Sequence, residues 1–213
     1  MTQLIPTVLA HSKEECFQKL CHEGLRALAP LWQIDVLDGS LFGASSWASP
    51  MEITAFPSLP DLEIHFMVKD PLAVLSQWFS LLPSISCITV HPEIDHRSQT
   101  IEAILASGKS VGLAIEATTD LSMIQDDLPL LSYLIMMGVP PGASGQPFLG
   151  EPVLEKIKEI HKLFPGLPVG IDGGITLAMK KTLISLGIER FYLGSSLWNS
   201  EDPGAAYQKF LET

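Results

Sequence analysis

The chain has 213 residues, of which 46% are hydrophobic and 17% are charged, a composition that excludes general disorder. This length suits one domain with a sizeable core better than two full-sized domains. The 13 Lys and Arg residues against 24 Asp and Glu residues give a formal net charge of −11, which argues against binding to nucleic acid or to an anionic membrane.

The dominant sequence pattern is a short apolar run, then a turn, then a longer amphipathic stretch. The apolar runs show little polar alternation, which is typical of parallel strands buried on both faces. In chain order, the predicted strands are Leu4–Leu9, Trp32–Leu37, Leu62–Met67, Ser86–Val90, Ser110–Ile115, Leu131–Val139, Pro168–Ile171 and Arg190–Leu193. The predicted helices are Lys13–Leu28, Pro71–Leu81, Gln99–Ser107, Leu121–Asp127, Glu151–Leu163, Leu177–Leu186 and Pro203–Leu211; the pattern does not assign Trp47–Ala55 clearly.

Eight strands that alternate with helices predict an α/β fold, a (β/α)8 TIM barrel that spans residues 1–213 as a single domain. A doubly wound open sheet is the competing architecture. Its glycine-rich turn after the first strand is missing, because residues 7–12 contain no glycine.

Signals for export and membrane insertion are weak. The first residues lack a basic leader and a long apolar core, so we expect no signal peptide and a cytoplasmic protein. The run 71–90 carries no charge, but Gln77, Pro83 and several serines favour a helix, a loop and a strand over a membrane span. The three cysteines match neither a disulfide framework nor a metal-ligand spacing.

Polar side chains occur where several apolar strands end, and in a barrel these ends carry the chemistry. Asp35 interrupts the second apolar run, and Asp172 follows the seventh run directly before two glycines. Burying a carboxylate without a partner is costly, so we interpret both as inward-facing functional groups rather than turn residues. Gln33 alternates with Asp35 and therefore shares its face.

His65 lies near the end of the third strand. A single histidine is usually a core residue bonded to the backbone, but together with two inward aspartates a ligand role is favoured. Met67, Met136 and Met137 would usually be core-packing residues, but at strand ends they could instead roof a small apolar pocket. His91 also ends a strand, and we assign it no catalytic role.

Short glycine-containing segments follow the sixth, seventh and eighth strands. Barrels commonly hold a phosphate in the loops after strands seven and eight, where backbone N–H groups surround the anion. Ordinary turns explain each segment alone, but their order along the fold favours a phosphate site. The candidates are Gly173, Gly174, Gly194 and Ser195, and Gly142, Ala143, Ser144 and Gly145 belong to the segment that follows the sixth strand.

Eight segments, in this order, resemble the ribulose-phosphate 3-epimerase family. They are PTVLA at 6–10, WQIDVLDG at 32–39, EIHFMVKDP at 63–71, ITVHPE at 88–93, VGLAIEATTD at 111–120, MMGVPPGASGQPF at 136–148, VGIDGGIT at 169–176 and LGSSLW at 193–198. The resemblance implies an isomerase that inverts C3 of a ketose phosphate, converting D-ribulose 5-phosphate and D-xylulose 5-phosphate into each other. It also implies a homo-oligomer.

The resemblance further implies a set of site residues. Asp35 and Asp172 would be the catalytic acid/base pair, and Gln33, Asp35, His65 and Asp172 would hold a divalent cation, Zn, Fe, Mn or Co. The small-molecule sugar phosphate would contact Thr7, Met67, Met137, Gly142, Ala143, Ser144, Gly145, Gly173, Gly174, Gly194 and Ser195.

Four departures from the family pattern leave alternatives open. Gln33 replaces a histidine ligand, so the metal would be weakly held or absent, because a neutral carboxamide binds zinc-like ions less well than imidazole. Leu37 replaces a methionine, Thr7 replaces a serine, and the loop SLFGASSWASP differs from the family's HFVPN pattern. A non-catalytic phosphosugar-binding relative is the main alternative. A lyase on the same barrel is disfavoured, because no DxKxxD motif occurs at the required place.

Overall fold

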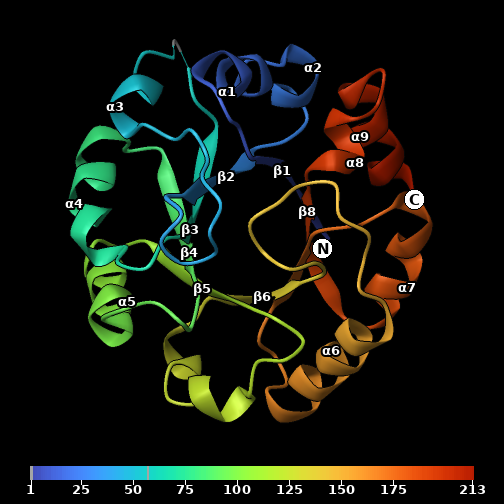
Figure 1. The fold of residues 1–213 in the computed structure, drawn as a ribbon. Coiled ribbons are helices and arrows are strands. Elements are labelled where there is room, and N and C mark those ends of the chain that lie inside the picture. Colours follow the sequence, from blue (N-terminus) through green and yellow to red (C-terminus); the bar gives the residue numbers. More distant parts are fainter. Residues whose placement is uncertain (1, 57) are drawn as a thin grey trace.

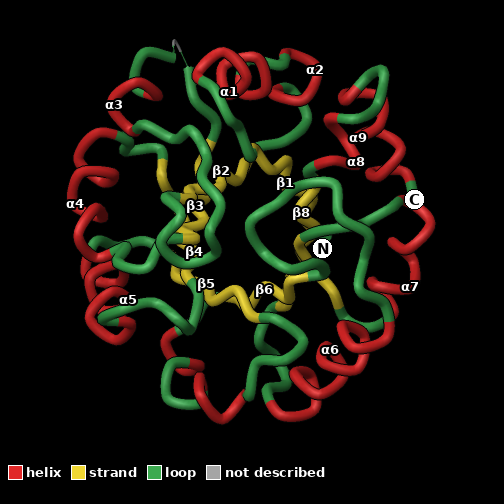
Figure 2. The backbone as a smooth tube through the Cα atoms, viewed as in Figure 1, coloured by secondary structure: helices red, strands yellow, loops and turns green. Residues whose placement is uncertain are grey.

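The computed structural model describes residues 2–56 and 58–213, and its eight strands close into a barrel in chain order, which confirms the predicted (β/α)8 fold (Figures 1 and 2). All neighbouring strands are parallel, including β1 and β8. The strands are β1 (Gln3–Val8), β2 (Leu31–Leu37), β3 (Asp61–Met67), β4 (Ile85–Val90), β5 (Ser110–Ile115), β6 (Tyr133–Met137), β7 (Val169–Asp172) and β8 (Ile188–Leu193).

Helices surround the barrel on its outside, as Figure 2 shows. They are α1 (Lys13–Leu20), α2 (Glu23–Arg26), α3 (Pro50–Ile53), α4 (Leu72–Leu81), α5 (Arg97–Ala106), α6 (Glu151–Leu163), α7 (Lys180–Ser185), α8 (Ser195–Trp198) and α9 (Pro203–Glu212). Three short 3-10 helices complete the ring: η1 (Leu121–Ile124), η2 (Leu128–Leu130) and η3 (Leu177–Met179).

Several predicted helices are shorter than the sequence pattern indicated. The predicted helix Lys13–Leu28 is broken into α1 and α2, because the Nδ1 atom of His22 accepts a hydrogen bond from Leu25 N and starts a new helix. The predicted helix Leu121–Asp127 is wrong: only the 3-10 helix η1 forms within it, and η2 follows, with a proline in its first turn. The segment Leu177–Leu186 likewise begins as η3 before α7, and α3 is the only helix within Trp47–Ala55.

Side chains of the strands alternate between two apolar layers. Residues such as Ile34 and Ile64 point outward and pack beneath the helices, while Leu31, Tyr133 and Ile135 fill the barrel interior. Burial of each such side chain contributes about 1.5–3 kcal/mol. The sixth strand is confined to Tyr133–Met137, shorter than the predicted Leu131–Val139.

A buried ion pair fills the barrel interior below the carboxyl-end pocket. Glu63 is fully buried, and its carboxylate accepts hydrogen bonds from Arg190 Nη2 at 2.6 Å, Tyr192 Oη at 2.9 Å and Thr89 Oγ1 at 2.8 Å. A buried carboxylate needs such partners to offset its desolvation. Because Glu63 and His65 point to the same side of β3, this ion pair supports the layer that carries His65.

Two loops lie over the carboxyl ends of the strands (Figure 1). One is the loop 138–150 after β6, and the other is the loop 38–49 after β2. They touch at Gly142, where a Cβ atom would lie only 3.4 Å from the Cβ of Phe42 and 3.5 Å from that of Ala44. The Gln146 side chain donates hydrogen bonds to Pro140 O at 2.7 Å and Ala143 O at 3.1 Å, which fixes the shape of the first loop.

Among the described residues, we find no helix with the length and apolar character needed to cross a membrane. The uncharged run 71–90 instead forms α4 and β4, as predicted.

Candidate active site

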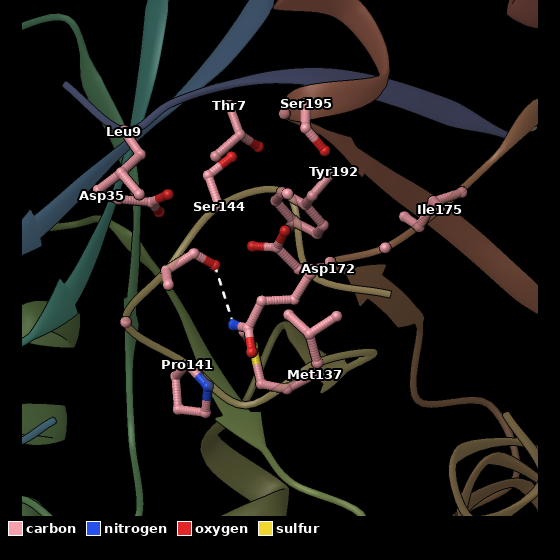
Figure 3. A pocket seen from close by; sticks show the side chains of 18 of the residues that line it. Thr7, Leu9, Asp35, Met137, Pro141, Ser144, Asp172, Ile175, Tyr192 and Ser195 are labelled. Carbon is pink, nitrogen blue, oxygen red and sulfur yellow. Dashed lines mark hydrogen bonds between the residues drawn. The ribbon is translucent and has the colours of Figure 1, made fainter. Parts of the chain in front are cut away.

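One pocket at the carboxyl ends of the strands gathers nearly all the predicted site residues (Figure 3). The exception is Gln33, which is fully buried behind two of them. Met136 does not line the pocket but packs in the outer core, so of the two interpretations considered for it core packing is the one observed. The predicted residues that line the pocket are Thr7, Asp35, His65, Met67, Met137, Gly142, Ala143, Ser144, Gly145, Asp172, Gly173, Gly174, Gly194 and Ser195.

Asp35, His65 and Asp172 form the polar centre of the pocket. Asp35 and His65 are directly opposed on the neighbouring strands β2 and β3, so their side chains enter the barrel side by side. His65 Nδ1 lies 3.3 Å from Asp35 Oδ1 and 3.9 Å from Asp172 Oδ2. One ligand atom from each of the three residues lies within 4.8 Å of the others, close enough to share one cation.

The Gln33 carboxamide joins the two carboxylates. Its Nε2 donates a 2.9 Å hydrogen bond to Asp35 Oδ1 and another of 2.9 Å to Asp172 Oδ2. Its Oε1 is buried and has no hydrogen-bond partner among the described residues. In this orientation the N–H₂ group of the amide links the two carboxylates. The amide would have to rotate before its oxygen could bind a cation held between them.

Burial and neighbouring charges shift the pKa values of this centre. Burial, with the nearby Asp35 carboxylate second, raises the pKa of Asp172 to about 7, against a weaker lowering by His65 and Gln33. Burial alone would lower the pKa of His65, but Asp35, Asp172 and Glu63 outweigh it and raise that pKa. The pocket can therefore hold and exchange protons near neutral pH.

Three of the four predicted metal ligands, Asp35, His65 and Asp172, are arranged so that they could bind one divalent cation. Two carboxylates and an imidazole are ligands that Zn, Mn, Fe and Co accept. His65 Nδ1 is buried and faces both carboxylates, so it is the nitrogen placed to ligate a cation together with them. The amide nitrogen of Gln33 fits less well, because an N–H₂ group cannot bind a cation.

Backbone segments form another wall of the pocket. Gly173 and Gly174 have φ values of +102° and +68°, and a Cβ on either would collide with Val139 or Phe148, so glycine is required for the β6 loop to pack here. Figure 3 shows Thr7 and Ser195 together at one side of the pocket. Thr7 Oγ1 is buried and has no hydrogen-bond partner among the described residues.

Sequence reasoning missed two residues that bear on this site. Lys19 reaches it from α1, its Nζ bonded to Leu9 O at 2.7 Å and Glu15 Oε1 at 2.6 Å. No sequence pattern distinguishes Lys19 from a surface helix residue. His91 is buried against His65, and its place at the end of a strand was the one available signal.

Fold and pocket together define a (β/α)8-barrel protein with a carboxylate–imidazole cluster at the end of the barrel that carries chemistry in such folds. The family model described as the Ribulose-phosphate 3 epimerase family matches residues 8–198. The chain therefore belongs to the ribulose-phosphate 3-epimerase family, which confirms the resemblance found in the sequence.

Curated relatives agree with this assignment. The ribulose-phosphate 3-epimerase of Mycobacterium tuberculosis is 27% identical over 213 residues, covering 95% of this chain and 89% of its own. That of Aquifex aeolicus is 26% identical and covers 98% of this chain and 95% of its own. Proteins with this name are isomerases that act on carbohydrates, which supports an enzyme of epimerase type.

Likeness to other solved barrels shows the fold alone. A tryptophan synthase α-subunit mutant from Pyrococcus furiosus superposes with a TM-score of 0.75 at 11% identity, covering 99% of this chain and 98% of its own. The 3-hexulose-6-phosphate synthase from Salmonella typhimurium has a TM-score of 0.71 at 16% identity, covering 99% and 97%.

Proposed function

We propose that this protein inverts C3 of a ketose phosphate, converting D-ribulose 5-phosphate and D-xylulose 5-phosphate into each other. The observation that carries the proposal is the meeting of Asp35 and Asp172 in one pocket, within 4.8 Å of each other and of His65. Family membership supports the reaction class.

Inversion at C3 needs an acid and a base on opposite faces of a planar intermediate. One carboxylate removes the C3 proton, and the other returns a proton from the opposite side. Asp35 projects from β2 and Asp172 from β7, so the two approach the pocket from different walls of the barrel. The raised pKa of Asp172 allows that residue to carry a proton near neutral pH.

A divalent cation, Zn, Fe, Mn or Co, would be held by Asp35, His65 and Asp172 and would stabilise negative charge on the substrate oxygens as a Lewis acid. Gln33 is the fourth proposed ligand through its carboxamide oxygen, and the neutral amide makes this the weakest contact of the set. The chain's own residues orient the substrate and move the proton.

The phosphate of the substrate is proposed to lie against the backbone of the loops after β7 and β8, at Gly173, Gly174, Gly194 and Ser195. Backbone N–H groups suit a dianion in a protein with a net charge of −11. Among the described residues that line the pocket, Lys19 is the one Lys or Arg, and it is paired with Glu15 at 2.6 Å.

The remaining pocket residues are proposed to cover the substrate. Met67 and Met137 present apolar surface beside Asp35 and Asp172, which favours exclusion of water from the reacting carbon. The loop residues Gly142, Ala143, Ser144 and Gly145 lie over the pocket, and Thr7 offers a hydroxyl with no partner among the described residues. Self-association and a cytoplasmic location remain predictions of the sequence.

The test is direct conversion of D-ribulose 5-phosphate in a coupled assay for D-xylulose 5-phosphate, with EDTA or with added Zn, Mn, Fe or Co. We expect turnover that at least one cation stimulates. Binding of the sugar phosphate without turnover under any of these conditions would instead identify a non-catalytic phosphosugar-binding protein.

A further inference from the structure

We propose that His91 is a positioning residue for His65: it accepts a hydrogen bond from His65 Nε2–H and so keeps His65 Nδ1 in place to ligate a cation together with Asp35 and Asp172. The inference deepens the proposed function, since it concerns how the chain prepares one ligand of the same site. His91 lies outside the cluster that can share a cation, and acts only through His65.

The contact between the two histidines is direct and buried. The Nε2 atoms of His65 and His91 are 2.9 Å apart, and the exposed fractions of the two residues are 0% and 1%. Their rings are nearly parallel, with an interplanar angle of 17° and centroids 5.0 Å apart. Two imidazole nitrogens at this separation must share a single hydrogen, one donating it and the other accepting it.

The place of His65 Nδ1 sets the direction of this hydrogen bond. His65 Nδ1 lies 3.3 Å from Asp35 Oδ1 and 3.9 Å from Asp172 Oδ2, so it is the nitrogen that would ligate a cation shared with the two carboxylates. A neutral imidazole that ligates through Nδ1 carries its hydrogen on Nε2, so His65 is the donor and His91 Nε2 is the acceptor. A neutral His91 that accepts at Nε2 carries its own hydrogen on Nδ1, the atom that lies 3.9 Å from Glu93 Oε2.

Packing holds His91 in the required orientation. Phe42, from the loop after β2, meets the His91 ring edge-on, with centroids 4.8 Å apart and an interplanar angle of 71°. His91 is therefore held between Phe42 and His65. Partners that fix the tautomer of a ligating histidine typically change metal affinity by 10–100-fold when removed.

The test combines NMR of the wild-type chain with two variants. In protein labelled with ¹⁵N at histidine, we expect a coupling across the hydrogen bond between the two Nε2 atoms, with the hydrogen on His65 Nε2 and a second hydrogen on His91 Nδ1. A hydrogen that resides on His91 Nε2, or the absence of any coupling between the rings, would overturn the proposal. This readout needs neither turnover nor bound metal.

Zn²⁺ affinity, measured by competition with a chelator on the full-length variants, gives the second readout. His91→Phe keeps an aromatic ring but cannot accept the hydrogen bond, and we expect it to weaken Zn²⁺ binding by about 10–100-fold. His91→Gln keeps an acceptor oxygen near the position of Nε2, and we expect it to restore most of the affinity. Equal Zn²⁺ affinity for wild type and His91→Phe would contradict the proposal, whereas normal Zn²⁺ binding without epimerisation would contradict only the proposed function.

Discussion

Gln33 and Asp172 are 139 residues apart in the chain, yet Gln33 Nε2 donates a 2.9 Å hydrogen bond to Asp172 Oδ2 inside the barrel. The same nitrogen bonds Asp35, so one neutral side chain links both proposed proton-transfer groups. The two hydrogen bonds hold the carboxylates together. They come from residue 33, where the family pattern has a histidine.

Replacing Gln33 by histidine is expected to strengthen metal binding. An imidazole nitrogen is a better ligand than a carboxamide for zinc-like ions, so Gln33→His should raise the amount of Zn bound per chain after dialysis against a fixed low concentration of free Zn²⁺. Gln33→Leu, which removes both the amide donor and the oxygen, is the matched control and should bind no more Zn than wild type. Equal metal content in wild type and Gln33→His would count against Gln33 as a weak ligand.

The barrel was predictable because its strands are buried on both faces, and so appear in the sequence as apolar runs that recur at regular intervals. The run at β2, for example, is apolar apart from Gln33 and Asp35, and the two polar residues mark the inward face. The helices on the outside were harder to delimit, because their ends depend on single contacts. The break between α1 and α2 rests on the His22 side chain, which hydrophobic periodicity does not report.

The stability of the metal-free protein should fall as pH rises through neutrality. The pKa of Asp172 is about 7 in the fold against an ordinary value of 3.8, so between these values the native state binds more protons than the unfolded chain. Its contribution to stability is present below pH 4 and is lost as pH rises through 7, at about 1.4 kcal/mol per pH unit at most.

Urea denaturation in EDTA at pH 5 and pH 8, on wild type and Asp172→Asn, measures this effect. The asparagine variant does not titrate at this position, so its free energy of unfolding should fall less than that of wild type. The explanation fails if the two proteins show the same pH dependence.

The ion pair beneath the pocket should be essential for stability. Arg190→Met would leave the fully buried Glu63 carboxylate without a cation and should lower the free energy of unfolding by about 3–5 kcal/mol, measured by urea denaturation. Adding Glu63→Gln to this variant removes the unpaired charge and should recover part of the loss. A loss below about 1 kcal/mol for Arg190→Met would show that Glu63 does not need this partner.

Lys19 should contribute to phosphate affinity. It is the one Lys or Arg among the described pocket-lining residues, and Lys19→Gln is expected to raise KM for D-ribulose 5-phosphate by about tenfold, the loss of one charge-assisted hydrogen bond. Lys19→Arg keeps the charge and should stay closer to wild type. Steady-state kinetics separate KM from kcat, and an unchanged KM in Lys19→Gln would place the phosphate away from α1.

The candidate site was only partly predictable from the sequence. Asp35 and His65 stand at the ends of neighbouring strands, so their meeting follows from the register of a parallel sheet. The bridge formed by the Gln33 amide depends on closure of the barrel and on side-chain rotamers, which residue types do not specify. The pairing of His65 with His91 likewise appears only when β3 and β4 are in place.

The proposed function depends on Asp35 and Asp172 working as one acid/base pair, and exchange of the C3 proton of D-ribulose 5-phosphate in D₂O, followed by proton NMR, measures that most directly. With the stimulating cation present, we expect wild type to exchange this proton and Asp172→Asn to lose exchange by about two orders of magnitude or more. Exchange at the wild-type rate in Asp172→Asn, with the variant folded, would remove Asp172 from proton transfer and contradict the mechanism.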